Sequence, residues 1–120
     1  METTKVLVVD DDETVLRIVS SYLNRSGGYE VISTCSSQEA LEIVRRSTIE
    51  LLISDIMMPG MLGSRLFQEI KQISPDIACI LISGYQKEMH NFPPDIVFLK
   101  KPFNSEELLS AIKTVRTRTA

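Results

Sequence analysis

The sequence lacks both a long apolar run and a secretion signal. None of its hydrophobic stretches approaches the roughly 20 residues that a membrane-spanning helix needs. The N-terminus, METTKVLVVDDD, places acidic residues directly after a short apolar run, which is unlike a signal peptide. We therefore expect a cytoplasmic protein that does not enter a membrane.

Cysteine, histidine and net charge are also scarce. Cys35 and Cys79 are too few for a disulfide framework, and no nearby residues complete a set of metal ligands around them. We expect both to be small core or strand-edge residues in a reducing environment. The single histidine, His90, gives little support for histidine catalysis. A net charge of −3 predicts neither nucleic acid nor an anionic membrane as the main partner.

What the sequence does contain is an ordinary globular composition arranged in alternating segments. Its 120 residues, 43% of them hydrophobic, predict a single domain over 1–120 with a core of about 5–116. Short runs rich in β-branched residues predict five strands, at 5–9, 29–33, 51–54, 77–82 and 96–99. Three of these runs are almost continuously apolar, as in a parallel sheet that is covered on both faces.

Amphipathic segments with start and stop signals lie between the predicted strands. These signals are Gly27-Gly28 after the first helix, Ser36 with Glu39 before the second, Pro75 after the third, and Asn104 with Glu107 before the last. The alternation predicts an α/β fold, a doubly wound five-stranded parallel sheet. Segment 84–95, which contains two consecutive prolines, should form only a short or irregular fourth helix.

Polar residues follow four of the five predicted strands. They are Asp10 and Asp11 after the first, Asp55 after the third, Ser83 after the fourth, and Lys100 and Lys101 after the fifth. Ligands of open α/β sheets bind beyond the carboxyl ends of the strands, so these side chains should meet at one edge. Adjacent strand residues face opposite ways, so only one of the two lysines can serve. Clustered carboxylates are suitable ligands for Mg²⁺, and a carboxylate can accept a phosphoryl group. Phosphoryl transfer needs mainly positioning and charge neutralisation, which Mg²⁺ and a lysine provide, so the pattern predicts a phosphoryl-accepting site.

Four motifs in order carry a family resemblance: VLVVDDDETVLR, LLISDIMMPGMLG, ILISGY and FLKKPF. Over about residues 5–115 the chain resembles the receiver domain of two-component response regulators. The resemblance implies a flavodoxin-like (CheY-like) sheet in the strand order 2-1-3-4-5. It also implies Mg²⁺-dependent acceptance of phosphate from a histidine kinase or histidine phosphotransfer protein, followed by a conformational switch. A receiver of this kind is not a turnover enzyme.

The resemblance also implies a role for each matching residue. Asp55 would be the phosphoacceptor, and Asp10, Asp11, Asp55 and the backbone carbonyl of Met57 would bind Mg²⁺. Lys101 would pair with the phosphoryl group and precede a cis peptide bond to Pro102, while Ser83 would be the switch hydroxyl and Phe98 the aromatic whose rotamer reports phosphorylation. Asp12 and Glu13 are expected to be acids of a first helical turn rather than ligands.

Several positions depart from the usual family pattern. Leu62 stands where an acid is common and Ser64 where an apolar residue is usual, which predicts an altered start to the third helix. The stretch before Lys101 is shorter than usual by roughly one helical turn, which bears on the surface that commonly carries the output signal. Met57 and Tyr85 lie two positions beyond Asp55 and Ser83, and in receivers such positions control water access to the phosphoaspartate. An apolar and a bulky residue there predict slow self-dephosphorylation.

Other functions remain open at this point. Asp10 to Thr14 fits the DxDxT motif of haloacid-dehalogenase-like phosphatases, although that hypothesis leaves Asp55 without a role. A receiver-like docking module that is never phosphorylated is a second alternative. A flavodoxin-like phosphate-binding module is disfavoured because three consecutive aspartates would repel the phosphate.

The sequence does not name the kinase, the pathway or the output, and a homodimer stays open. It contains no DNA-binding region, so the chain is either a stand-alone receiver or part of a larger regulator. PPDIVFLKKPF resembles receivers attached to hybrid sensor kinases.

Overall fold

The computed structural model describes residues 3–58, 61–84 and 96–119, and these form five strands and four helices. The strands are β1 (Thr4–Val9), β2 (Tyr29–Thr34), β3 (Leu51–Asp55), β4 (Ala78–Ser83) and β5 (Ile96–Lys100). The helices are α1 (Glu13–Ser26), α2 (Ser37–Arg46), α3 (Gly63–Ile73) and α4 (Ser105–Thr119). Each predicted strand is present within a residue or two of its predicted bounds. The irregular helix predicted within 84–95 falls almost wholly outside the described residues, as do Tyr85 and His90.

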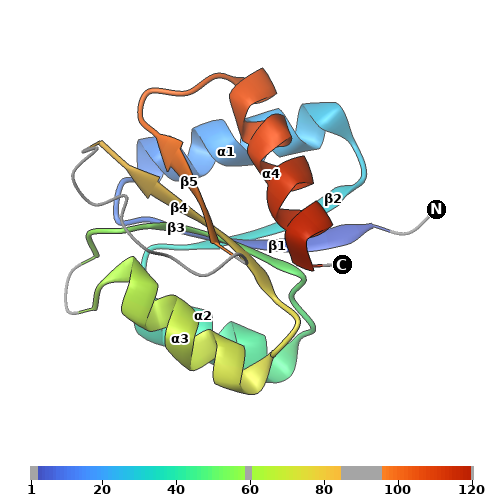
Figure 1. The fold of residues 1–120 in the computed structure, drawn as a ribbon. Coiled ribbons are helices and arrows are strands. Elements are labelled where there is room, and N and C mark those ends of the chain that lie inside the picture. The colour runs from blue at the N-terminus through green and yellow to red at the C-terminus, as the bar shows by residue number, and fades with distance from the viewer. Residues whose placement is uncertain (1–2, 59–60, 85–95, 120) are drawn as a thin grey trace.

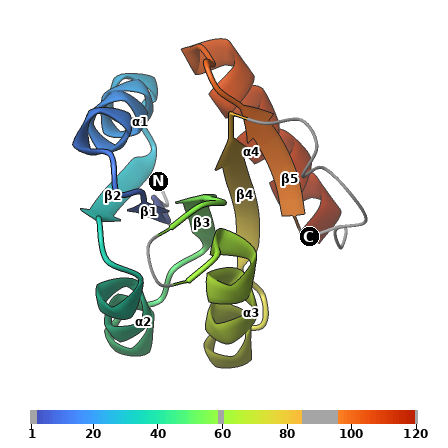
Figure 2. The same cartoon turned by 90° about the vertical axis from the view of Figure 1, so that its left-hand side faces the viewer.

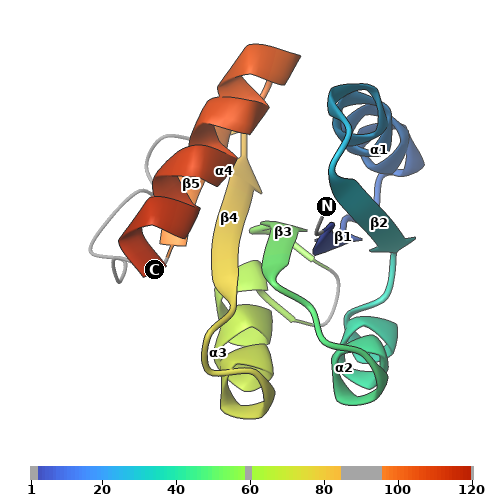
Figure 3. The ribbon, with the colours of Figure 1, turned by 90° about the vertical axis from the view of Figure 1, so that its right-hand side faces the viewer.

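All five strands are parallel, in the order β2-β1-β3-β4-β5, which confirms the predicted topology. Helices α1 and α4 cover one face of the sheet and α2 and α3 the other (Figures 1, 2 and 3). Because the strands run the same way, their carboxyl ends lie along one edge. The strand order reverses between β1 and β3, so the chain leaves these two strands toward opposite faces of the sheet. Ligands of open α/β sheets bind at such a switch point.

The sheet separates two apolar layers. Alternate residues of the central strands point into one layer or the other; Leu7 and Leu52, for example, pack toward α2 and α3, whereas Val8 and Ile53 pack toward α1 and α4. Burial on both faces explains why β3 and β4 are almost continuously apolar in sequence. Both cysteines are free; Cys79 is buried within β4.

Most of the predicted helix signals act as expected. Gly27 ends α1 at a φ of 77°, and Asn104 and Glu107 form a reciprocal capping box at α4, with N–H to side-chain oxygen distances of 3.0 and 2.8 Å. At α2 only half of the predicted box is present, since Ser36 Oγ accepts the Glu39 N–H at 3.2 Å. The Glu39 carboxylate accepts a hydrogen bond from Thr34 Oγ1 instead.

The start of α3 lacks a side-chain cap. Leu62 occupies the N-cap position and offers no side-chain hydrogen bond to the first turn of the helix. Its side chain is about half exposed at 49%.

None of the helices in the described part of the chain combines the length and apolarity needed to cross a bilayer.

Candidate functional site

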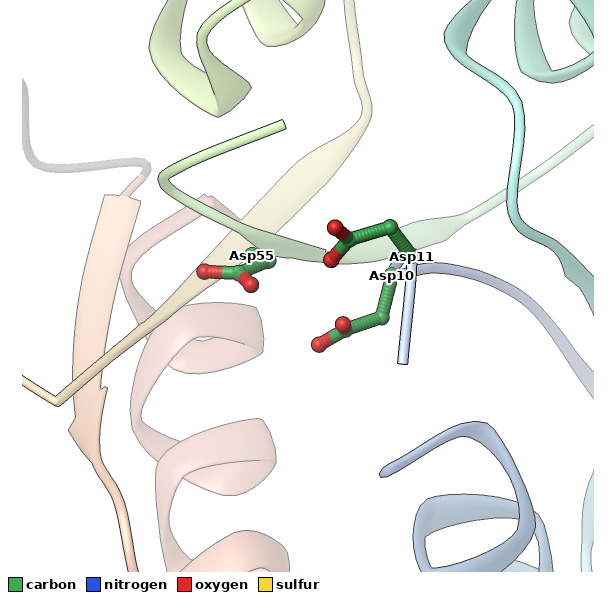
Figure 4. A group of neighbouring side chains, drawn as sticks. All are labelled: Asp10, Asp11 and Asp55. Carbon is green, nitrogen blue, oxygen red and sulfur yellow. The ribbon is translucent and has the colours of Figure 1, made fainter. Parts of the chain in front are cut away.

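Three carboxylates meet at the carboxyl ends of β1 and β3. Asp10 and Asp11 follow β1, Asp55 is the last residue of β3, and one oxygen of each lies within 4.8 Å of the others. Figure 4 shows the side chains of Asp10 and Asp11 extending from the end of β1 toward Asp55. The parallel register of β1 and β3 causes this meeting. Val9 pairs with Ser54, so Asp10, the residue after β1, comes level with Asp55, the last residue of β3.

A single ammonium group contacts two of these carboxylates. Lys101 Nζ lies 3.5 Å from Asp55 Oδ2 and 3.6 Å from Asp10 Oδ2. The Lys101 N–H donates to the carbonyl of Ser83 at 2.8 Å, which ties the residue to the end of β4. Lys100, the last residue of β5, is exposed, so the tertiary structure selects Lys101 from the two lysines. The Lys101-Pro102 peptide bond is cis, as predicted.

Asp10 is the buried member of the cluster, with a side chain only 1% exposed. Its Oδ1 accepts the Asp12 N–H at 2.9 Å, whereas its Oδ2 is buried without a hydrogen-bond partner among the described residues. Burial raises the pKa of Asp10 from 3.8 to about 6; the Asp12 hydrogen bond and Lys101 oppose this rise, and the charges of Asp55 and Asp11 add to it. The group is therefore poised for a cation that would favour its charged form.

Asp55 is held at both its side chain and its main chain. The Met57 N–H donates to Asp55 Oδ1 at 3.2 Å, while the Met57 side chain is 56% exposed and does not enter the cluster. The main-chain carbonyl of Asp55 accepts the Ser54 hydroxyl at 2.9 Å. Gly63 packs against the same carbonyl so closely that a Cβ there would lie 2.2 Å from the oxygen.

Sequence reasoning missed the contributions of Ser54 and Gly63. A hydroxyl inside an otherwise apolar strand was one available signal for Ser54, and a glycine at the start of an amphipathic helix was another for Gly63. Neither signal names Asp55 as the contact, because that contact depends on how the loop after β3 folds back.

The donor set fits a hard divalent cation. All three side chains offer carboxylate oxygens. The buried Asp10 Oδ2 accepts no hydrogen bond among the described residues, with the Lys101 ammonium 3.6 Å away. Three negative charges against the one ammonium of Lys101 leave an excess of negative charge. Mg²⁺ is typically bound by one or two carboxylates together with water and phosphate oxygens, which this arrangement allows.

The remaining predicted residues lie on β4, on β5 and at the start of α1. Ser83 ends β4 and is 5% exposed, and Phe98 in β5 is half-buried against the layer under α2 and α3. Asp12 is the N-cap of α1, its side chain accepting the Thr14 N–H at 2.9 Å, and Glu13 lies in the first turn. Both acids thus lie outside the three-carboxylate cluster, in agreement with the prediction.

A doubly wound parallel sheet with carboxylates and a lysine at its switch point defines a CheY-like domain. The family model of the response regulator receiver domain matches residues 6–113. The chain therefore belongs to this family and is a receiver domain of two-component response regulators. This confirms the family and the fold predicted from the four sequence motifs.

Individual relatives agree with this assignment. The sensor kinase CckA of Brucella abortus is 36% identical over 114 residues, which cover 90% of this chain and 12% of that protein. The transcriptional regulatory protein GlrR of Escherichia coli is 32% identical over 124 residues, which cover 96% of this chain and 27% of that protein. The chain thus spans only a small part of the length of these two curated relatives.

Solved structures agree as well. The receiver domain of the hybrid histidine kinase CckA has a TM-score of 0.76 at 33% identity, covering 93% of this chain and 98% of that one. The chemotaxis response regulator CheY4 of Vibrio cholerae has a TM-score of 0.83 at 27% identity, covering 94% of this chain and 98% of that one.

Proposed function

We propose that this receiver accepts a phosphoryl group on Asp55 as a step of a two-component phosphorelay. The observation that carries the proposal is the placement of the Lys101 ammonium 3.5 Å from Asp55 Oδ2, beside a cluster with excess negative charge. Catalysis of phosphoryl transfer depends mainly on positioning and on neutralising charge. A carboxylate nucleophile with one ammonium group beside it and two further carboxylates to bind a second cation meets both needs.

In this proposal the carboxylates of Asp10, Asp11 and Asp55 and the backbone carbonyl of Met57 would hold Mg²⁺. The bound ion supplies positive charge that offsets the carboxylates and the incoming phosphoryl oxygens. The oxygen-only donor set and the buried Asp10 Oδ2, which accepts no hydrogen bond among the described residues, support this assignment.

The chain's own residues position the acceptor and its new group. Transfer forms a bond between an Asp55 carboxylate oxygen and phosphorus while the bond from phosphorus to the donor breaks. The Met57 N–H, which donates to Asp55 Oδ1, fixes the orientation of the carboxylate. Lys101 lies on the side of Oδ2 and offsets the negative charge of the phosphoryl oxygens.

Phosphorylation would then shift a pre-existing conformational equilibrium. The phosphoaspartate adds about −1.5 to −2 charges at the edge of the sheet. We assign Ser83 as the hydroxyl that binds a phosphoryl oxygen and Phe98 as the aromatic side chain that changes rotamer in response. Ser83 lies at the end of β4, the strand hydrogen-bonded to β3, so its main chain is already coupled to the acceptor strand.

The phosphoryl donor would be a histidine kinase or a histidine phosphotransfer protein. The matched relatives are a sensor kinase and a transcriptional regulatory protein, so the output of this receiver would lie in a separate domain or protein. We propose that residues 1–120 hold only the receiver, which takes up phosphate and loses it slowly rather than turning over a substrate. The apolar residue Met57, two positions beyond Asp55, supports slow loss.

The test is incubation of the purified protein with acetyl phosphate and Mg²⁺, followed by intact mass measurement. We expect the wild type to gain one phosphoryl group and Asp55→Asn to gain none. Asp12→Asn is the matched control, because Asp12 is an exposed N-cap outside the cluster and asparagine caps helices equally well. Omission of Mg²⁺ should abolish the gain on the wild type.

Two results would contradict the proposal. Absence of a mass gain on the wild type with Mg²⁺ would leave a docking module without phosphorylation as the better description. Turnover of a phosphate ester that Asp10→Asn abolishes and Asp55→Asn preserves would instead support the phosphatase hypothesis, in which Asp10 is the nucleophile.

A further inference from the structure

Ser54 is a buried polar residue inside an apolar layer. Its side chain is 0% exposed, and its register partners Val9 and Leu81 both belong to the core layer beneath α2 and α3. A hydroxyl in such surroundings is unfavourable unless it is hydrogen-bonded. The Ser54 hydroxyl donates to the main-chain carbonyl of Asp55 at 2.9 Å.

The carbonyl that Ser54 binds is the one that Gly63 packs against. The Gly63 N–H donates to the Ile56 carbonyl at 2.7 Å, which draws the first residue of α3 onto the backbone just after β3. At Gly63 there is no space for a Cβ, which would lie 2.2 Å from the Asp55 oxygen and 3.1 Å from its carbonyl carbon. The peptide group after Asp55 is thus held from two directions, by a hydroxyl and by a close backbone contact.

Resting on the proposed function, we propose that Ser54 is a positioning residue for the phosphoacceptor. The Ser54 hydroxyl fixes the peptide plane after Asp55, and this plane sets the position of the Met57 N–H that orients the Asp55 carboxylate. The carboxylate in turn keeps its Oδ2 facing Lys101. Ser54 touches neither the phosphoryl donor nor the cation, so it acts only through the geometry of Asp55.

The test compares Ser54→Ala, Ser54→Thr and Ser54→Cys with the wild type. The initial rate of phosphorylation by acetyl phosphate is measured at saturating Mg²⁺ and normalised to folded protein. Loss of one hydrogen bond to a main-chain carbonyl corresponds to a rate about fivefold to tenfold lower for Ser54→Ala. Ser54→Thr keeps the hydroxyl and should stay within about twofold of the wild type, while Ser54→Cys keeps the size but donates weakly and should resemble Ser54→Ala.

Two further measurements separate positioning from stability. The matched control is Ser37→Ala, which removes a different buried hydroxyl. Ser37 lies on α2, and its hydroxyl has no hydrogen-bond partner in the described chain. The phosphorylation rate of Ser37→Ala should equal that of the wild type. The amide resonance of Met57 in NMR spectra should shift in Ser54→Ala and return in Ser54→Thr, because this N–H donates to the Asp55 carboxylate.

The inference and the proposed function fail in different ways. A wild type that takes no phosphate contradicts the proposed function. The inference is overturned if the wild type takes up phosphate and Ser54→Ala matches it in phosphorylation rate and in the Met57 amide resonance, while unfolding at a lower midpoint. Ser54 would then be a purely structural residue. If Ser54→Ala does not fold, a Ser54→Cys variant with the wild-type rate overturns it equally.

Discussion

Replacing Asp10 with asparagine should make the protein more stable at neutral pH when no divalent cation is present. Asp10 is buried, and its pKa is raised from 3.8 to about 6, chiefly by desolvation. At pH 7 the folded state therefore carries a carboxylate that its surroundings disfavour. Asparagine has the same shape as the neutral acid, and its side-chain oxygen can still accept the Asp12 N–H.

The size and pH range of the effect follow from the two pKa values. In the unfolded chain Asp10 ionises near pH 3.8, and in the folded protein near pH 6, so the unfolded state releases its proton first as the pH rises. The contribution of Asp10 to stability is thus fully present below about pH 4 and is lost as the pH rises through about 6. The difference between the two values corresponds to roughly 3 kcal/mol, which Asp10→Asn should recover at pH 7.

Urea unfolding in EDTA, from pH 3.5 to pH 7.5, measures this difference. We expect the two proteins to be equally stable near pH 3.5 and Asp10→Asn to exceed the wild type by about 3 kcal/mol at pH 7.5. Mg²⁺ at 100 times its dissociation constant should stabilise the wild type by about 2.7 kcal/mol and the variant much less, which nearly closes the gap. A variant that is less stable at pH 7.5, or a gap that persists unchanged at pH 3.5, would refute the reasoning.

Three further substitutions test the fold around the site, each by urea unfolding at pH 7.5. Gly63→Ala should destabilise by about 3 kcal/mol or more, because its Cβ would meet the Asp55 carbonyl; Gly84→Ala, where a Cβ meets nothing within 4 Å, is the control and should change little. Equal effects of the two would contradict the close contact. Leu62→Asp should stabilise by about 1 kcal/mol by supplying the missing cap of α3, and an unchanged midpoint would argue against that deficiency. Ser37→Ala should raise the free energy of unfolding by about 1 kcal/mol, since it removes a buried hydroxyl without a partner in the described residues; a loss of stability would mean that this hydroxyl is hydrogen-bonded.

Much of the site could be predicted because its residues are marked by local sequence. An apolar run followed at once by an acid, as at Asp10 and Asp55, identifies the end of a buried strand, and parallel strands necessarily place such ends at one edge. Helix caps are equally local, since the Asn104 and Glu107 partners are three residues apart. Of the two hydrogen bonds that the Ser36–Glu39 pattern predicts, only the one from the Glu39 N–H to Ser36 Oγ is present. The Glu39 carboxylate instead accepts the hydroxyl of Thr34, the last residue of β2.

The sequence by itself determined the order of strands and helices, the fold class and the residue types that gather at the sheet edge, because hydrophobic periodicity and turn chemistry act over a few residues. Only the tertiary structure decided that Asp10 is buried while Asp11 is exposed. The strand pattern left Lys100 and Lys101 both open and the family resemblance named Lys101, whose ammonium the structure places beside Asp10 and Asp55. The tertiary structure also brought Gly63 onto the carbonyl of Asp55. These outcomes depend on desolvation and through-space contact between segments far apart in the chain, which no local pattern encodes.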